Sequence, residues 1–271
     1  MSTPRMITPL LSTLRCLAAL MALTLSFTVS AADGQMQRIP TRTGVVVPTW
    51  WLKQDNAPAT LVLLSGGAGT IGPLDASGWP KAGNFLIRSG KLFAARGYNL
   101  AMVAKPSDVE GLDPVFRIDA RHIEDLHKVL VHLKEQSSAP IWLVSTSQST
   151  ISTVAMAIAE RDSGLISGIV LTSSMTNFKT PGAVPKQALD QIKLPVLVMH
   201  HERDSCDSCR PYEVHWIMRG LKNAPVKKLI MVNGGENPTG DPCDAFHYHG
   251  YIGMEKEAVG IITDWIRQPA N

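Results

Sequence analysis

One serine stands at the junction of an apolar run and a helical segment. Residues 141–150 read IWLVSTSQST, and Ser147 lies where the first pattern gives way to the second. A nucleophilic serine needs such a strand-to-helix turn, because the turn projects its hydroxyl above a sheet. Small residues must flank it two positions away on each side, usually glycines; here they are Ser145 and Ser149. The alternative interpretation is a helix N-cap rich in Ser and Thr, which suit that position.

A glycine-rich loop is the second chemical feature. Residues 63–69 read LLSGGAG and follow an early apolar run. Such a loop can turn backbone N–H groups towards one point, as acyl transfer requires for its oxyanion. We expect one N–H donor from Gln148 and another from residues 66–68, with Gly67 the best single candidate. The alternatives are a flexible loop or a phosphate cradle, but no Gly-Lys-Ser/Thr follows, which excludes a nucleotide P-loop.

A carboxylate follows a later apolar run. Residues 194–204 read LPVLVMHHERD, which predicts a buried strand with an acidic turn at its carboxyl end. A Ser–His pair needs a carboxylate that orients the imidazole and stabilises its cation. Asp204 is the best placed, with Glu202 and Asp207 as rivals. The alternative is a turn or capping residue before the next helix.

Two histidines lie in the loop before the closing helix. Residues 244–251 read DAFHYHGY and contain His247 and His249. Either imidazole could lie over a nucleophile that an earlier strand delivers. Their spacing sends them to opposite sides of an extended loop, so we expect only one of them to act as a base.

The elements that must position these residues alternate between short apolar strands and helices. We expect an antiparallel edge pair within residues 36–53. Later strands are expected at 60–64, 99–104, 141–144, 168–171, 195–199 and 228–232, and helices at 84–95, 115–135, 151–159, 212–221 and 254–266. This alternation predicts a mostly parallel sheet covered on both faces. Sites in such sheets lie beyond the carboxyl ends of the strands.

The order Gly-rich loop, Ser, Asp, His resembles the α/β-hydrolase family over about residues 60–267. The phrase LFAARGYN at residues 92–99 looks like the helix-to-strand turn of these enzymes. His249, followed by a Gly-Tyr pair and an amphipathic helix, is similar to their C-terminal end and favours His249 over His247 as the base. The pattern of Pro195, a strand, His200 and Asp204 also matches. Ser145 and Ser149 at the turn, and Ser65 where a His often begins the oxyanion loop, depart from the family pattern.

The resemblance implies one α/β-hydrolase domain over residues 32–271, with about eight strands. Only about 20 residues separate Ser174 from Pro195, so we expect no large lid and small or flexible acyl substrates. Ser147 would attack an acyl carbonyl, His249 would take its proton and Asp204 would hold the imidazole; no cofactor or metal is needed. Esters are favoured, whereas thioesters, amides and peptides stay open. An inactive hydrolase-fold binding protein is the alternative.

The cysteines support a further expectation. If Asp204 and His249 meet, the loops bearing Cys206 and Cys243 must also approach, so we expect a disulfide between these two, with Cys209–Cys243 as the next choice. The competing hypothesis is a zinc-binding protein. Its ligands would be Cys206, Cys209, His247 and His249.

The N-terminal residues and the net charge bear on location and partners. Residues 1–31 carry two arginines, an apolar run and a small-residue cleavage site, which predicts a secretory signal and a periplasmic or secreted protein. The net charge of the full chain is +3, and loss of the two arginines leaves about +1. This gives no electrostatic case for binding nucleic acid or a membrane after signal cleavage. The oligomeric state is not readable from the sequence.

Overall fold

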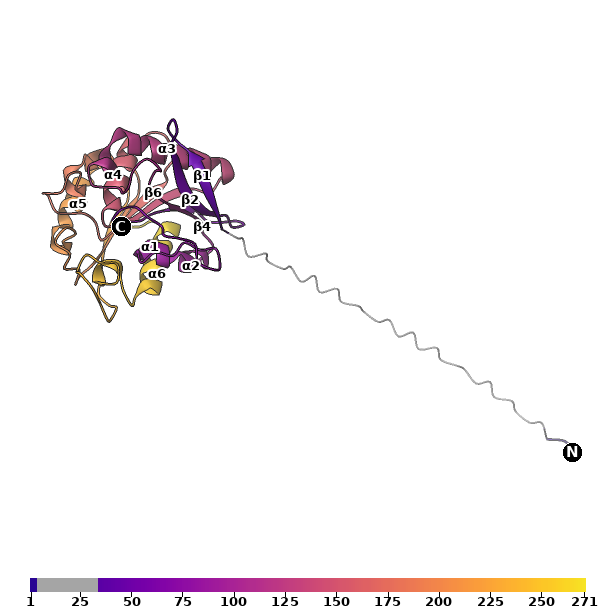
Figure 1. The fold of residues 1–271 in the computed structure, drawn as a ribbon. Helices are drawn as coiled ribbons and strands as arrows, with labels where there is room; N and C mark the ends of the chain where they lie inside the picture. The colour runs from indigo at the N-terminus through magenta and orange to yellow at the C-terminus, as the bar shows by residue number, and fades with distance from the viewer. Residues whose placement is uncertain (4–33) are drawn as a thin grey trace. The chain divides into compact units, whose positions relative to one another are not determined.

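A central sheet organises the computed structural model, which describes residues 1–3 and 34–271 (Figure 1). The predicted signal segment therefore lies outside the described residues apart from its first three. The sheet has eight strands in the order β1-β2-β4-β3-β5-β6-β7-β8. Strand β2 pairs antiparallel with both β1 and β4, and all the other neighbouring strands pair in parallel. The strands are β1 (Gln35–Pro40), β2 (Val46–Leu52), β3 (Thr60–Leu64), β4 (Asn99–Val103), β5 (Ile141–Thr146), β6 (Gly168–Thr172), β7 (Val196–His201) and β8 (Lys227–Val232). This confirms the predicted sheet of about eight mostly parallel strands.

The inner strands are apolar without alternation because both of their faces are covered. Every residue of β3, TLVLL, is buried. Val62 and Leu64 pack in the core on one side of the sheet, and Leu61 and Leu63 pack in the core on the other. Continuous apolar runs are typical of parallel strands between two helical layers. By contrast, the edge strand β1 leaves four of its six residues exposed, among them Arg38 and Pro40, which blunt an edge against further strand pairing.

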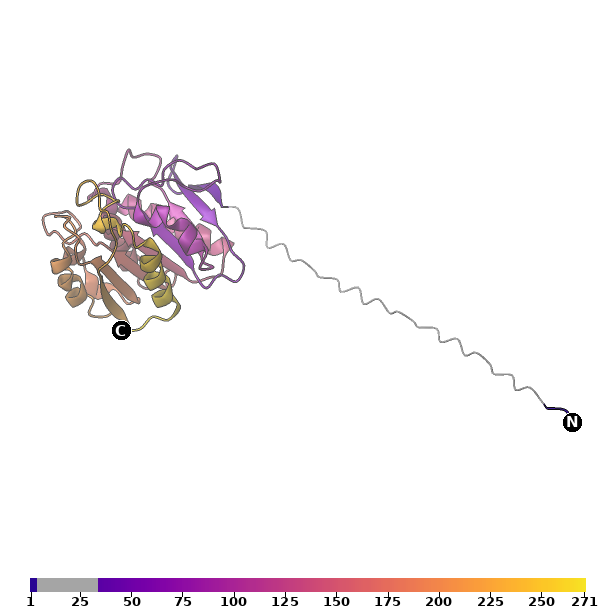
Figure 2. The same cartoon turned by 90° about the horizontal axis from the view of Figure 1, so that it is seen from below.

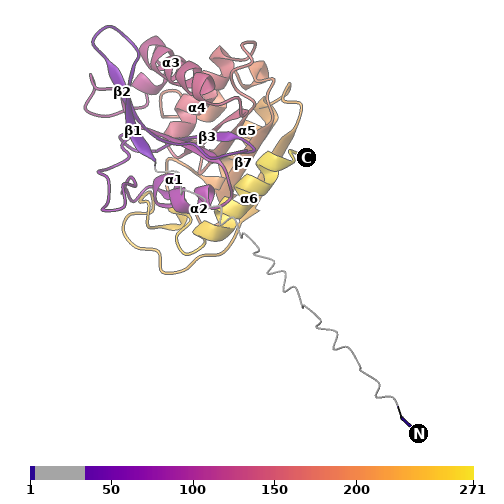
Figure 3. The ribbon, with the colours of Figure 1, turned by 90° about the vertical axis from the view of Figure 1, so that its right-hand side faces the viewer.

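Two helical layers cover the sheet, as Figure 3 shows with the sheet between them. One layer comprises α3 (Ala120–Gln136), α4 (Ser149–Ala159) and α5 (His215–Gly220). The other comprises α1 (Phe85–Arg88), α2 (Gly90–Ala94) and α6 (Glu255–Arg267), which lie in front of the sheet in Figure 2. Short 3-10 turns span Phe116–Ile118, Val184–Lys186, Leu189–Gln191, Pro211–Glu213 and Tyr248–Gly250. None of the helices in the described part of the chain has the length and hydrophobicity to cross a membrane.

The helix expected at residues 84–95 is divided into two. Asn84 caps α1 by accepting a hydrogen bond from the Leu86 N–H, and the chain leaves helical geometry at Ser89. Helix α2 then begins at Gly90, where an added Cβ would lie 2.2 Å from Met102 Cε. The missing side chain of Gly90 therefore leaves room for the Met102 side chain of β4 in its present position.

The helix expected at residues 115–135 begins five residues late. Asp119 is its N-cap, and the Asp119 side chain accepts a hydrogen bond from the Arg121 N–H. The preceding residues form the 3-10 turn Phe116–Ile118. Arg117 lies in this turn and is buried, which the hydrophobic periodicity of the sequence did not predict.

The topology brings the predicted site residues to one edge. Strand order reverses at β3, because β4 lies on one side of it and β5 on the other. In open α/β sheets such a switch point marks the ligand crevice beyond the carboxyl ends of the strands. The Gly-rich loop follows β3, Ser147 follows β5, and Asp204 follows β7. The segment between β6 and β7 holds two 3-10 turns, and the expectation of no large lid is confirmed.

Two buried histidines should make the stability of the folded protein depend on pH. His122 on α3 and His200 on β7 each leave Nδ1 without a hydrogen-bond partner among the described residues. Burial lowers the pKa of His122 to about 3 and that of His200 to about 4. The unfolded chain takes up these protons near pH 6.5, so stability present at pH 7 is lost as the pH falls. At pH 5 we expect a loss of about 2 kcal/mol from each histidine.

Urea unfolding at pH 7 and pH 5 measures this dependence. In His122→Gln the loss of unfolding free energy over that interval should be about 2 kcal/mol smaller than in the wild type. All other titrating groups are common to both proteins, so the difference isolates His122. Equal losses in the two proteins would show that His122 does not titrate as described.

Candidate active site

Ser147 occupies a strained turn at the end of β5. Its φ is +57°, in the left-handed region that non-glycine residues seldom adopt. Such a conformation costs on the order of 1–3 kcal/mol and persists where the surroundings impose it. The Ser147 N–H donates to the Thr172 carbonyl of the neighbouring strand β6 at 3.1 Å, which ties the turn to the sheet. The backbone therefore has the geometry that lifts a side chain above the carboxyl edge.

Ser145 and Ser149, which stand where glycines are usual, form hydrogen bonds within the turn and to the strands beside it. Ser149 Oγ lies 2.6 Å from the Leu64 carbonyl and accepts from the Thr146 N–H at 2.9 Å. Ser145 Oγ donates to the Val170 carbonyl at 3.3 Å. Both residues are buried. Their hydroxyls therefore satisfy the turn and its neighbouring strands, and the departure from glycine leaves the turn intact.

The Gly-rich loop after β3 packs directly against the turn. An added Cβ at Gly66 would lie 2.9 Å from Ser147 Cβ, so no side chain fits there. Gly67 has a φ of +54°. Among the described residues, no hydrogen bond uses the backbone N–H of Gly67, Ala68 or Gln148. Free N–H groups on two sides of a serine are the donors that an oxyanion requires.

Asp204 and His249 form a buried pair beside the turn. Asp204 Oδ2 lies 2.8 Å from His249 Nδ1, and the carboxylate is fully buried. The other carboxylate oxygen, Oδ1, accepts from the Cys206 N–H at 2.9 Å, which fixes the plane of the group. The opposite ring nitrogen, His249 Nε2, is buried and has no hydrogen-bond partner among the described residues. The imidazole is thus oriented at one nitrogen and available at the other.

The rival acids and the rival base lie elsewhere. Glu202 accepts from Asn233 Nδ2 at 2.8 Å on the surface. The Asp207 side chain is 95% exposed and lies near Arg210. His247 stacks edge-on against Tyr248. None of the three rivals contacts the Asp204–His249 pair.

A cleft with a volume of about 340 Å³ joins the serine to the base. Its wall includes Gly66, Ala68, Ser147 and His249. No hydrogen bond links Ser147 Oγ to His249 Nε2; the Ser147 hydroxyl instead lies 3.9 Å from the Cys209 thiol. Catalytic hydrogen bonds are often long or unformed in ligand-free structures. The two groups share one cleft and are not hydrogen-bonded to each other.

Solved structures resemble the chain closely in fold and distantly in sequence. A serine hydrolase without a lid from Xanthomonas campestris is 12% identical, with a TM-score of 0.60 over 88% of this chain and 97% of that one. An esterase from Pyrococcus furiosus is 14% identical, with a TM-score of 0.64 over 88% and 91%. The chain has the α/β-hydrolase fold. A dienelactone hydrolase from Anabaena variabilis, 11% identical, gives 0.61 over 88% and 100%. No family model and no curated protein matches the sequence.

The loop that carries His249 in this α/β-hydrolase fold is held from two sides. Ser173 Oγ donates to the His249 carbonyl at 2.7 Å. Arg88 donates to the carbonyls of Gly250 and Gly83, both at 2.6 Å, and pairs with Glu255 at 2.9 Å. Because Gly83 and Gly250 both line the cleft, Arg88 ties its two walls together.

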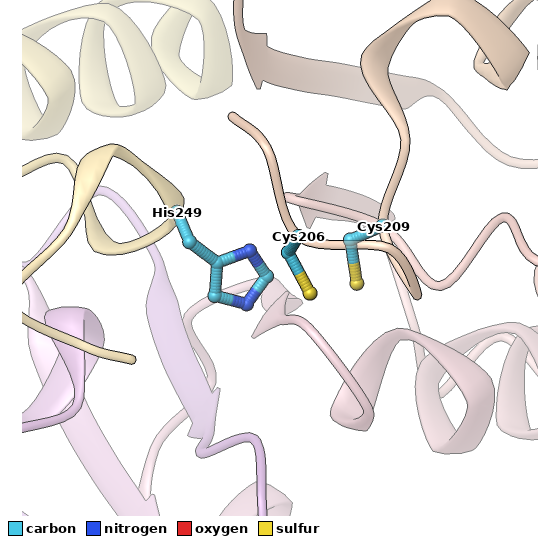
Figure 4. A group of neighbouring side chains, drawn as sticks. All are labelled: Cys206, Cys209 and His249. Atoms are coloured by element: carbon cyan, nitrogen blue, oxygen red, sulfur yellow. The ribbon is translucent and has the colours of Figure 1, made fainter. Parts of the chain in front are cut away.

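A disulfide joins the loop of the acid to the loop of the base. Cys206 is bonded to Cys243, the pairing that the sequence favoured, and Cys209 is a buried free thiol. Burial raises the pKa of the Cys209 thiol well above its usual range. Figure 4 shows the His249 imidazole pointing towards the loop that carries Cys206 and Cys209.

The predicted zinc ligands do not come together as a set. Suitable ligand atoms of Cys206, Cys209 and His249 lie within 4.8 Å of one another. However, the Cys206 sulfur is bonded to Cys243, and zinc binding requires a thiolate. His249 already directs Nδ1 to Asp204, and His247 is not part of this cluster. The donor set of the disulfide-bonded protein does not fit the metal.

Removal of this disulfide should destabilise the domain. The bond closes a loop with a sequence separation of 37, and a closure of that length stabilises by about 4 kcal/mol. The double variant Cys206→Ala/Cys243→Ala should lose that amount in urea unfolding. Cys209→Ala, which leaves the disulfide in place, serves as the control. A double variant within 1 kcal/mol of the wild type would contradict this role.

Some residues of the site gave no signal in the sequence. Cys209 was expected as a spare cysteine, a second-choice disulfide partner or a metal ligand, yet its thiol lies within hydrogen-bonding distance of Ser147 Oγ. Arg88 and Arg117 are ordinary positions in segments that the periodicity assigns to helices. Their contacts to loop carbonyls arise from tertiary packing, which a single sequence does not encode as a motif.

Proposed function

We propose that this protein is a serine hydrolase that cleaves an acyl bond, most directly a carboxylic ester. Ser147 is the nucleophile, His249 the general base and Asp204 the residue that orients it. The observation that carries the proposal is the buried 2.8 Å contact of Asp204 with His249 in the same cleft as the strained Ser147. The similarity in fold to hydrolases and esterases supports it.

The reaction follows from this arrangement. Ser147 Oγ attacks the acyl carbonyl while His249 Nε2 takes the hydroxyl proton, and Asp204 stabilises the imidazolium. The developing oxyanion lies between the Gln148 N–H and the N–H groups of residues 66–68. His249 then gives its proton to the leaving alcohol. Water, deprotonated by the same imidazole, releases the acid from the acyl-enzyme.

Small acyl groups are the proposed substrates. The cleft is of modest volume, and the described chain has no large lid to enclose a long aliphatic tail. Pockets of this size bind small molecules by a few placed polar groups on an apolar wall. Phe85, Ala68 and Ala82 supply apolar contacts.

Initial rates on p-nitrophenyl esters from acetate to dodecanoate test this proposal. We expect kcat/KM to be highest for acetate to butyrate and to fall for longer chains. Butyryl p-nitroanilide, which presents the same acyl group as an amide, tests the preference for an ester. Absence of turnover on every ester and thioester tried would favour a hydrolase-fold binding protein.

We also propose that the protein acts outside the cytoplasm, in the periplasm or as a secreted enzyme, after removal of residues 1–31. The Cys206–Cys243 disulfide supports this location, because structural disulfides persist in oxidising compartments. N-terminal sequencing of the mature protein tests the cleavage site, which should follow Ala31 or lie within a residue or two of it.

A further inference from the structure

Arg117 is a buried cation without an acidic partner. Its side chain is among the largest fully buried ones in the protein, with 1% of the residue exposed. No carboxylate of the described residues lies within ion-pair distance of it. Buried charges are normally paired, because removing a charge from water is costly. The contacts that Arg117 does make therefore indicate what its charge is used for.

Those contacts are to the two elements that frame Ser147. Arg117 Nη2 donates to the Gly67 carbonyl at 2.8 Å and lies 3.5 Å from the Ser65 carbonyl. Nη1 donates to Ser152 Oγ on α4 at 3.0 Å. Helix α4 begins directly after Gln148, and the Gly-rich loop follows β3. One guanidinium thus links the loop to the helix whose first residues follow the nucleophile.

The charge at this position is maintained at neutral pH. Burial lowers the pKa of Arg117 to about 9, and the charge of Asp113 opposes that effect. His122, which shares Ser152 Oγ at 2.9 Å, is neutral above pH 4 because burial and the Arg117 charge lower its pKa to about 3. Arg117 therefore carries a positive charge that no carboxylate of the described residues contacts directly, although the charge of Asp113 acts on it from beyond ion-pair distance.

The hydrogen bond from Arg117 to the Gly67 carbonyl also sets the direction of the Ala68 N–H, because both groups belong to the same peptide. A trans peptide is planar, and its C=O and N–H point in opposite directions. All peptides of the described residues are trans. Because the Gly67 carbonyl faces the buried guanidinium, the Ala68 N–H faces away from the interior, on the side where both residues are exposed and line the cleft.

We propose that Arg117 is a positioning residue of the oxyanion hole. It holds the Gly67 carbonyl so that the Ala68 N–H, beside that of Gln148, receives the oxyanion formed at Ser147. This deepens and rests on the proposed hydrolase function, and it moves the loop donor from Gly67, the residue that the sequence favoured, to Ala68. The oxyanion, the peptide and the guanidinium form one chain of hydrogen bonds with an anion at one end and a cation at the other. Each bond in such a chain polarises the next.

The test compares Arg117→Met and Arg117→Lys with the wild type on p-nitrophenyl butyrate. The methionine fills the site without charge or donors, and we expect kcat to fall about 10- to 100-fold with KM changed less than threefold. Lysine keeps the charge but lacks the two-pronged donor set, so it should restore part of the loss and not all of it. Arg121→Met, which removes an exposed arginine one turn along α3, is the matched control and should leave kcat unchanged.

A transition-state readout separates orientation from general structure. An aliphatic trifluoromethyl ketone forms a tetrahedral oxyanion with the serine, so its affinity should fall in Arg117→Met by the same factor as kcat/KM. Thermal unfolding checks that both variants are folded, and if the methionine variant does not fold, the lysine variant alone decides through the same inhibitor. Full kcat and inhibitor affinity in a folded variant would overturn the role of Arg117 but leave the hydrolase standing. A wild type without ester turnover would overturn both.

Discussion

Replacing His249 by alanine should lower kcat for ester hydrolysis by about 10⁵- to 10⁶-fold, the largest effect expected in the molecule. The reason is that Ser147 Oγ loses the imidazole that shares its cleft, and no other histidine of the described residues lines that cleft. His247 does not line the cleft, and it makes no contact with Asp204. KM should change little, because the imidazole acts in the transition state.

His247→Ala is the matched control, two residues away on the same loop. Its kcat should stay within about threefold of the wild type. Single-turnover measurements with p-nitrophenyl acetate give the acylation rate for both variants. If His247→Ala lost activity and His249→Ala kept it, the base would have been assigned to the wrong histidine.

Replacing Asp204 by asparagine should lower kcat about 10⁴-fold without unfolding the domain. The expected loss of activity follows from the hydrogen bond that the Cys206 N–H donates to Asp204 Oδ1. The asparagine carbonyl keeps that bond, so its NH₂ group faces His249 Nδ1. The imidazole must then carry its proton on Nε2, where it cannot accept the proton of Ser147.

Glu202→Gln serves as the control for this change, since Glu202 follows the same strand and pairs with Asn233. Its kcat should match that of the wild type. The loss in Asp204→Asn should be partly recovered at high pH, where hydroxide attacks without a general base. A tenfold loss or less in Asp204→Asn would contradict the assigned role of the carboxylate.

The mostly parallel sheet could be predicted because the inner strands are short, largely apolar runs that alternate with helices. Strand β3, TLVLL, has four consecutive apolar residues after Thr60, and such a run requires cover on both faces. Once the sheet is parallel, residues that follow its strands must meet at one edge. The order of Ser147, Asp204 and His249 along the chain then predicts their proximity without any knowledge of distances.

Positions set by long-range packing were not predictable in the same way. Arg117 lies within a segment that reads as helix, and only the 3-10 turn before α3 buries it under the Gly-rich loop. The close approach of Gly90 to Met102, just after the break at Ser89, is likewise a tertiary contact. The positive φ of Ser147 was implied by the strand-to-helix junction, but the role of Ser149 Oγ in satisfying that turn was not. These features depend on contacts between residues far apart in the sequence.

Labelling of the mature protein by a fluorophosphonate probe reports on Ser147 itself, because the probe forms a covalent adduct with an activated serine. We compare the wild type with Ser147→Ala and with a control, Ser145→Ala, which removes a hydroxyl that faces the neighbouring strand. We expect one adduct in the wild type, located at Ser147 by peptide mass spectrometry, its absence from Ser147→Ala, and its retention in Ser145→Ala. An unlabelled wild type, or equal labelling of Ser147→Ala, would contradict the assignment of Ser147 as the nucleophile.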